Sequence, residues 1–356
     1  MTLDRSPFPL DPGPAPAGGI TGSSGTGRFL QFIFLVSAVS MVVFHARTEA
    51  FTTFSIIFSS IVLEAFPFML LGTLLGGMVE VFLSRDRLVR LLPGNRWLAI
   101  ATAAFLGIIF PVCECAVVPV VRKFIQKGMP LGSAVAFLLG GPIVNPLVFT
   151  STLVAYSFSW ETAVIRVVMG VGIAVAGGIF IDSTVPRNLA LVPDSGGLSQ
   201  DCCHNGCTHN HHTSQSFPEK IKAALAHGAA DFYDIGRFLI MGAFIAAALQ
   251  TLVARQELLF MAEGPVIAIA TMMLMAVILN LCSEADAFIA ASFQPMGIPL
   301  SAQMAFMVLG PMLDIKLILM YLGAFTRKMI LHLVCFVCLA VFLASLAMEV
   351  CQWFVA

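Results

Sequence analysis

Two cysteines separated by one glutamate, Cys113-Glu114-Cys115, lie inside a stretch that is otherwise apolar. Thiolates bind soft ions such as Cu(I), Zn(II) and thiophilic As(III), whereas carboxylate oxygens prefer hard cations. Free cysteines are also common as small buried apolar residues, which is the alternative interpretation of both thiols. Glu114 weighs against it, because a carboxylate at the centre of a membrane costs about 2.5–3.5 kcal/mol on insertion scales. We therefore predict that this tripeptide lines a path for a soft ion.

A second set of chemically capable residues lies in the later part of the chain. Cys282 is followed by Glu284 and Asp286, and the same cost applies to these carboxylates. Asn145 and Asp314 each follow a Gly-Pro pair, where a helix is expected to break and to free carbonyl oxygens that can coordinate a cation. The alternative is a proline kink whose polar side chain only satisfies the loosened backbone. We predict that all five residues line the transport path or exchange protons there.

Other ionisable residues also fall in or near apolar runs, and mutual ion pairing is the simplest expectation for them. This group consists of Glu64, Arg166, Asp234, Arg237 and Lys316. We expect Arg237 to pair with an acidic residue of another helix. For Arg166 and Arg237, pairing is favoured over a role in transport.

A polar loop contains a dense cluster of cysteines and histidines. Its members are Cys202, Cys203, His204, Cys207, His209, His211 and His212. Both ligand types suit Zn(II) and copper, but the spacing fits no standard closed zinc finger. We predict a mobile metal-binding loop that captures an ion and passes it on; the alternative is a polar loop without that role.

The composition indicates an integral membrane protein. Of 356 residues, 58% are hydrophobic and only 11% are charged, whereas soluble domains carry roughly a quarter charged residues. The formal net charge is −1, which gives no argument for nucleic acid. The sequence contains no P-loop or Rossmann fingerprint, so no nucleotide partner is predicted. The lipid bilayer is the expected surrounding.

The order of polar and apolar segments predicts an all-α, polytopic fold with about eight to nine hydrophobic helical segments. Residues 1–28 are rich in Pro, Gly and Ser and predict a disordered tail. A first membrane half is expected at 29–182, with an extra helix at 29–46. The Cys/His-rich loop and an amphipathic linker follow at 183–230, and the second half at 231–356. The loop at 84–96 has four arginines and one aspartate, which places it, and by extension the Cys/His-rich loop, in the cytoplasm.

An internal repeat relates the two halves. A shift of 169 residues aligns 113–142 with 282–311 without a gap, and ten of the thirty positions are identical, including the Gly-x-Pro and Gly-Pro pairs. Proline- and glycine-broken segments in corresponding positions of two halves indicate the central site of a transporter. The halves are inverted if the segments at the centre are hairpins that enter and return; the alternative is a plain series of crossings.

These motifs resemble a known family. The similar residues are Cys113-Glu114-Cys115, Pro119, Arg122, Gly128-x-Pro130, Ala134-x-Ala136-Phe137-Leu138, Gly141-Pro142, Asn145-Pro146 and Ser151-Thr152. From about Phe51 to its end, the chain resembles the predicted-permease family of bacterial inner-membrane proteins that includes the organoarsenical efflux permeases. The Cys/His-rich loop is similar to that of a branch associated with copper and zinc efflux. The resemblance implies an exporter of soft metal or metalloid ions without an ATPase of its own.

Two departures from the family pattern affect this expectation. The second copy has Cys-Ser-Glu at 282–284 instead of Cys-Glu-Cys, so the halves are not chemically equivalent. The histidine-rich loop is also not what an organoarsenical permease needs.

We therefore predict a secondary transporter of the bacterial inner membrane that exports zinc or copper, with no tightly bound cofactor and no enzymatic activity. Arsenite or trivalent organoarsenical efflux is the alternative within the same class. A membrane thiol oxidoreductase, in which Cys113 and Cys115 cycle as a disulfide, is the alternative from a different class. A metal sensor without transport, and assembly as a homo-oligomer, also stay open.

Overall fold

The computed structural model describes residues 49–82, 93–109, 113–186, 190–191, 217–252 and 264–355. The chain divides into two compact units, residues 1–51 and 52–356, and nearly all described residues belong to the second. The predicted tail at 1–28, the predicted helix at 29–46 and the Cys/His-rich cluster at 202–212 lie outside the described residues. Their structure therefore stays a prediction.

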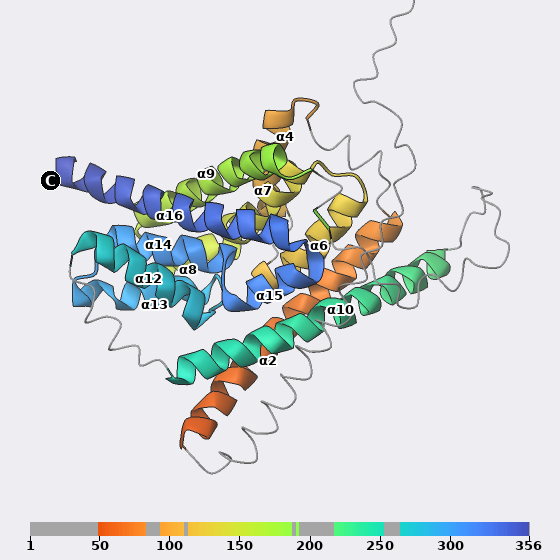
Figure 1. The fold of residues 1–356 in the computed structure, drawn as a ribbon, viewed down its shortest axis with the longest axis horizontal. Helices are drawn as coiled ribbons and strands as arrows, with labels where there is room; N and C mark the ends of the chain where they lie inside the picture. The colour runs from red at the N-terminus through yellow and green to blue at the C-terminus, as the bar shows by residue number, and fades with distance from the viewer. Residues whose placement is uncertain are drawn as a thin grey trace, which may run out of the picture. The chain divides into compact units, whose positions relative to one another are not determined.

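The described residues are helical almost throughout, with one isolated β-bridge between Leu191 and Phe325. The all-α prediction is thereby confirmed. The helices of the first half are α2 (Glu49–Phe82), α4 (Arg96–Ala104), α5 (Leu106–Ile109), α6 (Glu114–Gln126), α7 (Leu131–Val144), α8 (Pro146–Ala155) and α9 (Trp160–Thr184) (Figure 1). Those of the second half are α10 (Phe217–Leu252), α12 (Pro265–Leu279), α13 (Ala285–Ser292), the 3₁₀ turn η2 (Gln294–Met296), α14 (Leu300–Met312), α15 (Ile315–Ala324) and α16 (Arg327–Val355).

The helices of the second half repeat those of the first in the same order. A shift of 169 residues carries α8, Pro146–Ala155, onto α15, Ile315–Ala324, and the start of α7 at Leu131 onto the start of α14 at Leu300. The same shift relates α4 and α5 to α12. It also brings the first residues of α2 and α9 to within two residues of the first residues of α10 and α16. The duplication inferred from sequence is thus also present in the helix boundaries.

The halves contact one another reciprocally. Helix α6 of the first half packs against α15 of the second, and the counterpart of this pair, α13 against α8, is also in contact. The equivalent helices α7 and α14 pack against each other, as do α9 and α16 (Figure 1). A contact between two elements that recurs between their counterparts, with the halves exchanged, is the mark of a two-fold axis. The core of the molecule therefore has pseudo-two-fold symmetry.

Each half contains one long element that breaks near its middle. Helix α7 runs through Pro142 and ends before Asn145, whose backbone (φ −56°, ψ 127°) lies outside the helical region. A residue that precedes proline is restricted in this way, and Pro146 follows. At the equivalent place α14 ends before Asp314, without a following proline. The Asn145 side chain accepts from the Leu147 amide at 3.0 Å and caps α8. Asp314 caps α15 in the same manner, so capping is what the two breaks share.

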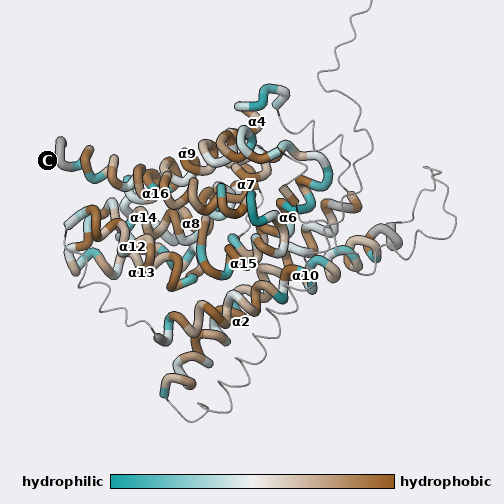
Figure 2. Tube along the Cα trace, viewed as in Figure 1, coloured by the Kyte–Doolittle hydropathy of each residue, from teal (hydrophilic) through white to brown (hydrophobic). Residues whose placement is uncertain are grey.

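Within the described residues, the helices long enough to cross a membrane are fewer than the hydrophobic segments that the sequence predicts. Five helices among the described residues have the required length and apolarity, and the bent pair α7 and α8 makes six. Of the eight to nine hydrophobic segments expected, 96–109 and 265–279 form helices shorter than the roughly 20 residues a span needs, and 29–46 lies outside the described residues. Each half then has three long elements, and the inverted orientation stays a prediction. Hydrophobic residues run along α2, α9 and α16 (Figure 2).

Two glycines allow close approach of the long helices to the core. An added Cβ at Gly72 of α2 would lie 2.6 Å from the Cα of Ala116 in α6. At Gly242 of α10 it would lie 2.8 Å from the Cα of Lys316 in α15. Helices α2 and α10 also contact each other through aromatic pairs, among them Phe66 with Phe232. These contacts hold α2 beside the first turn of α6 and α10 beside the first turn of α15.

Candidate functional site

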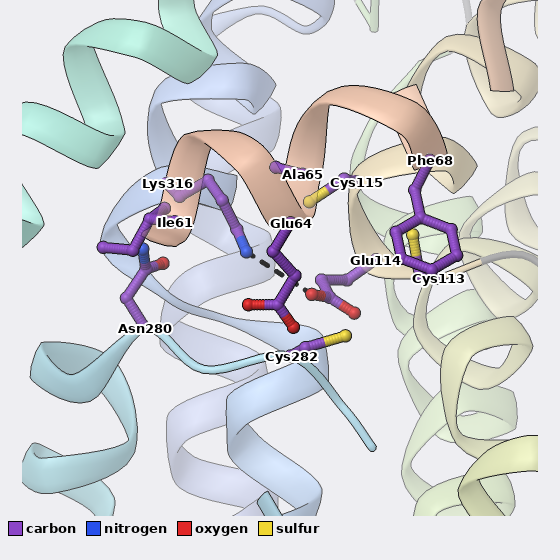
Figure 3. A pocket seen from close by; sticks show the side chains of 10 residues that line it. All are labelled: Ile61, Glu64, Ala65, Phe68, Cys113, Glu114, Cys115, Asn280, Cys282 and Lys316. Carbon is purple, nitrogen blue, oxygen red and sulfur yellow. Dashed lines mark hydrogen bonds and ion pairs between the residues drawn. The ribbon is translucent and has the colours of Figure 1, made fainter. Parts of the chain in front are cut away.

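A small pocket lies where the first turns of α6 and α15 meet α2 and the break between α12 and α13 (Figure 3). It is lined by Ile61, Glu64, Ala65, Phe68, Cys113, Glu114, Cys115, Asn280, Cys282 and Lys316. The free space suits a guest of the size of one water molecule or one ion. Three thiols, two carboxylates and one ammonium group therefore share an ion-sized space.

Local backbone structure brings these side chains together. Cys113 is extended (φ −78°, ψ 172°) and forms the N-cap of α6, so Glu114 and Cys115 fall in the first turn of that helix. On the opposite side α12 ends at Asn280, which adopts a left-handed conformation (φ 49°, ψ 49°) that asparagine tolerates better than most residues. The non-helical segment that follows carries Cys282 to the pocket.

Glu114 is the centre of the polar contacts. Its carboxylate is 1% exposed. Oε1 lies 3.4 Å from the Nζ of Lys316, and Oε2 accepts a hydrogen bond of 3.0 Å from the hydroxyl of Ser283. Lys316 and Ser283 both belong to the second half. The charge of Glu114 is thus compensated entirely across the interface between the halves, among the contacts that the described residues make.

Glu114 and Ser283 are also counterparts in the internal repeat, since they lie 169 positions apart. Two equivalent residues of a two-fold arrangement can contact each other only near the axis. The hydrogen bond between them therefore places the pocket beside the pseudo-two-fold axis, where the two broken halves meet.

Asp314 is the second carboxylate close to Lys316. Its side chain accepts from the Leu317 amide at 2.6 Å and lies 3.7 Å from the Nζ of Lys316. With the Asn280 amide oriented so that its nitrogen faces the carboxylate, Asn280 donates to both oxygens of Asp314, at 2.7 and 3.0 Å. Lys316 therefore lies between two buried carboxylates, one from each half.

A second buried polar cluster surrounds Arg166 of α9, which is fully buried. Its guanidinium donates to the hydroxyl of Thr152 at 2.8 Å and to the backbone carbonyls of Ser283 and Met307, each at 3.0 Å. Asp286 is buried beside α14, where its carboxylate lies against Gly310. Ser283 thus connects the clusters, because its hydroxyl binds Glu114 while its carbonyl binds Arg166.

The structure brings together some of the predicted path residues and separates others. Cys113, Glu114, Cys115 and Cys282 share the pocket, and Glu284 lies next to it, with an oxygen 3.6 Å from the sulfur of Cys282. Asp314 is joined to the pocket through Lys316 and Asn280. Asp286 interacts electrostatically with Arg166 and does not line the pocket, and Asn145 caps α8 outside it. The cysteines of the pocket are free.

Within the described ranges, no three His, Cys, Asp or Glu side chains converge closely enough to hold a metal ion in this conformation. Asn280 and Ser283 were absent from the predicted site, although the repeat contained a signal for the latter, because a shift of 169 places Ser283 opposite Glu114. Lys316 forms ion pairs, as predicted, with Glu114 and Asp314. Its partners are residues of the predicted path.

The expectation for Arg237 was wrong in its partner. Arg237 lies 4.0 Å from Asp234 of its own helix, one turn away, and both side chains are about half exposed. Spacing of i and i+3 places two residues on one face of a helix, so the nearest acid is available without another element. An acid of α10 that does pair with another helix is Asp231, whose carboxylate lies 3.0 Å from the Nζ of Lys123 in α6.

Comparison with known proteins identifies similar sequences along most of the chain. A family model described as "Predicted permease" matches residues 50–350. The chain is 37% identical to the UPF0718 protein YcgR of Bacillus subtilis over 301 residues, 85% of this chain and 98% of that protein. It is 38% identical to a putative two-component membrane permease complex subunit of Streptococcus mutans over 295 residues, 83% of this chain and 94% of that protein. The UPF0718 protein YraQ of Escherichia coli is 30% identical over 100 residues, 28% of each chain. No solved structure matches.

Proposed function

Because this chain belongs to the predicted-permease family and is a multi-pass protein of the bacterial plasma membrane, we propose that it exports a soft metal ion, zinc or copper, through the pocket around Glu114. The observation that carries the proposal is the meeting of Cys113, Cys115 and Cys282 in one ion-sized pocket beside the pseudo-two-fold axis. Thiolates select soft ions, and transporter sites form at repeat interfaces from broken helices.

The chemistry of the pocket supports a transported ion rather than a resident one. A carrier must bind its ion strongly enough to admit it and weakly enough to release it. The three thiols share a pocket but do not form a ready metal site within the described residues. In the proposed cycle, a change in the relative position of the halves brings Cys282 toward Cys113 and Cys115. Glu284, Asp286, Asn145 and Asp314 line the path or exchange protons.

The proposed direction is outward from the cytoplasm. The arginine-rich loop at 84–96 supports a cytoplasmic position for the polar loops. In this proposal the cluster at 202–212 collects the ion on the loading side. Metal binding to thiols and imidazoles releases protons, so proton flow in the opposite direction can drive the export.

Metal accumulation in a sensitised strain tests the proposal. Cells that express the Cys113→Ser, Cys115→Ser double variant should accumulate zinc or copper to the level of cells without the protein. The Cys335→Ser variant is the matched control, because Cys335 is exposed on α16 and outside the pocket. Full resistance of the double variant to copper, zinc and arsenite would overturn the proposed role of the pocket.

Export of arsenite or a trivalent organoarsenical is the second candidate. It is favoured by the composition of the pocket, which has three thiols and no imidazole among its lining residues. Deletion of 202–212 separates the candidates: export of zinc or copper should weaken, whereas arsenical export should persist. A thiol oxidoreductase would instead form a mixed disulfide with a partner protein, which a cysteine-trapping experiment would detect.

The name of the Streptococcus mutans relative suggests a partner subunit. That protein is described as a subunit of a putative two-component membrane permease complex. By analogy, we propose that this chain also works with a second membrane subunit. Purification of the tagged chain from its own host in a mild detergent should recover that subunit in fixed stoichiometry, and recovery of the chain alone would contradict this.

A further inference from the structure

We propose that Lys316 is a tethered counter-ion, which occupies the Glu114 carboxylate while the carrier is empty and is displaced by the transported ion. The inference rests on the proposed function and assigns a specific residue to control of the pocket. Its basis is the position of one ammonium group between two buried carboxylates of different halves.

The geometry gives the ammonium two alternative partners. The Nζ of Lys316 lies 3.4 Å from Glu114 of the first half and 3.7 Å from Asp314 of its own half. The side chains of all three residues are at most 4% exposed. Asp314 is held in place by the Leu317 amide and by Asn280. When Lys316 leaves Glu114, a fixed carboxylate therefore remains available to it, and no buried ammonium is left without a partner.

The lysine also occupies the place that a cation needs. It lines the same pocket as the three thiols, and its ammonium points toward the carboxylate of Glu114 (Figure 3). A transported cation that binds Glu114 and the thiols must compete with this internal positive charge. A cation and the ammonium of Lys316 that share this ion-sized, poorly hydrated pocket repel each other strongly. Entry of the ion and retreat of the lysine are therefore coupled.

The repeat shows that the lysine is not required by the fold. Its counterpart in the first half is Leu147, at the same place in the first turn of α8, and the side chain of Leu147 is 58% exposed. The helix break that Asn145 or Asp314 caps therefore forms with either leucine or lysine at this position. Lysine at position 316 costs free energy on burial, which a role in loading explains.

Displacement of the lysine would also change the contact between the halves. The ion pair with Lys316 and the hydrogen bond from Ser283 both join Glu114 to the second half. An ion that replaces Lys316 removes the ion pair, and its bonds to Cys282 and to Cys113 or Cys115 join the halves in place of that pair. The pair thus holds the halves together in the empty carrier, and loading exchanges this contact for one through the ion.

Binding of Cd²⁺ to the purified full chain tests the proposal. Cd²⁺ serves as a thiophilic probe, and its bonds to thiolates are followed by their ultraviolet charge-transfer absorbance. The cysteines outside the pocket are replaced by serine in every variant. Lys316→Met should bind Cd²⁺ at least about tenfold more tightly, because Glu114 is no longer occupied. Lys316→Arg, which keeps the charge, should bind as the parent does. Unchanged or weaker binding by Lys316→Met would overturn the proposal.

Two further variants exclude a merely structural effect. Lys316→Met combined with Glu114→Gln should bind no more tightly than the parent, and a gain equal to that of Lys316→Met alone would refute the role of Glu114. Lys123→Met removes another buried lysine, paired with Asp231 outside the pocket, and should leave Cd²⁺ affinity unchanged. Lys316→Met can also lower stability, and Lys123→Met is the control for this effect because it too removes a buried charge. A change in Cd²⁺ affinity that is specific to Lys316→Met is therefore not explained by lost stability.

Thiol labelling gives a readout that does not depend on metal. In membranes without added metal, a small maleimide should label the three pocket cysteines faster in Lys316→Met than in the parent, because the pair between the halves is lost. Equal labelling rates would contradict the closing role. Failure of the proposed function is recognised separately, since it rests on metal accumulation with the Cys113→Ser, Cys115→Ser variant.

Discussion

The turn at 113–115 and the turn at 282–284 occupy equivalent places in the two halves but differ in the charge that they bring to the axis. The first turn contributes Glu114, buried and bound by Lys316. At the same position the second turn contributes Ser283, whose carbonyl accepts from Arg166. The comparison teaches that the duplication supplied the scaffold twice and the central charge once. The site is therefore asymmetric within a pseudo-symmetric frame.

Replacement of Glu114 by alanine should have the largest effect on stability. The change leaves Lys316 with Asp314 as its remaining carboxylate and takes the acceptor from the Ser283 hydroxyl. A buried polar group that loses its partner costs about 1–3 kcal/mol. The free energy of unfolding, measured by denaturant titration in bicelles, should fall by that amount. A loss below about 1 kcal/mol would mean that the two turns are energetically equivalent.

Loss of the capping residue should also lower the free energy of unfolding by different amounts in the two halves, with smaller losses than at Glu114. Asn145→Ala removes one cap and should lower the free energy of unfolding by about 1 kcal/mol. Asp314→Ala removes a cap together with the contacts to Asn280 and Lys316, and its cost should be at least twice as large. The same bicelle titration compares them. Equal losses would show that Asp314 acts as a cap alone.

Replacement of Ser283 by alanine should have the smallest effect. Hydrogen bonds between helices in membranes contribute about 0.6 kcal/mol on average and at most about 1.7 kcal/mol. Glu114 keeps Lys316 in this variant, so stability should fall within that range and the affinity for Cd²⁺ should stay within about threefold of the parent. A loss as large as that of Glu114→Ala would assign the main contact between the halves to the serine.

Much of the fold followed from the sequence because its signals were strong. Hydrophobic segments, Gly-Pro pairs and the shift of 169 predicted the helices and the duplication. The number of crossings did not follow, because hydropathy does not separate a short apolar helix such as α12 from a span. Cys113, Glu114 and Cys282 were assigned to one site since each is costly or chemically distinctive.

The rest of the site could not be derived from residue types. Ser283 and Asn280 are ordinary loop residues by type. The repeat marks Ser283 as the counterpart of Glu114, but the contacts of both residues, with Glu114 and Asp314, are visible only in the tertiary structure. Asn145 has the same helix-capping signal as Asp314, yet one lies outside the pocket and the other beside it. Position relative to the axis decides between them, and that position depends on contacts between residues far apart in the chain.

The hydrogen bond between counterparts Glu114 and Ser283 also constrains how such a carrier can evolve. In a dimer of identical half-chains, whatever residue stood at this position would face its own copy across the axis. Two glutamates in direct contact could not both be ionised, and two serines would carry no charge. Within one chain the two copies can differ, so a single carboxylate and a single lysine can lie at a point where exact two-fold symmetry would not allow them.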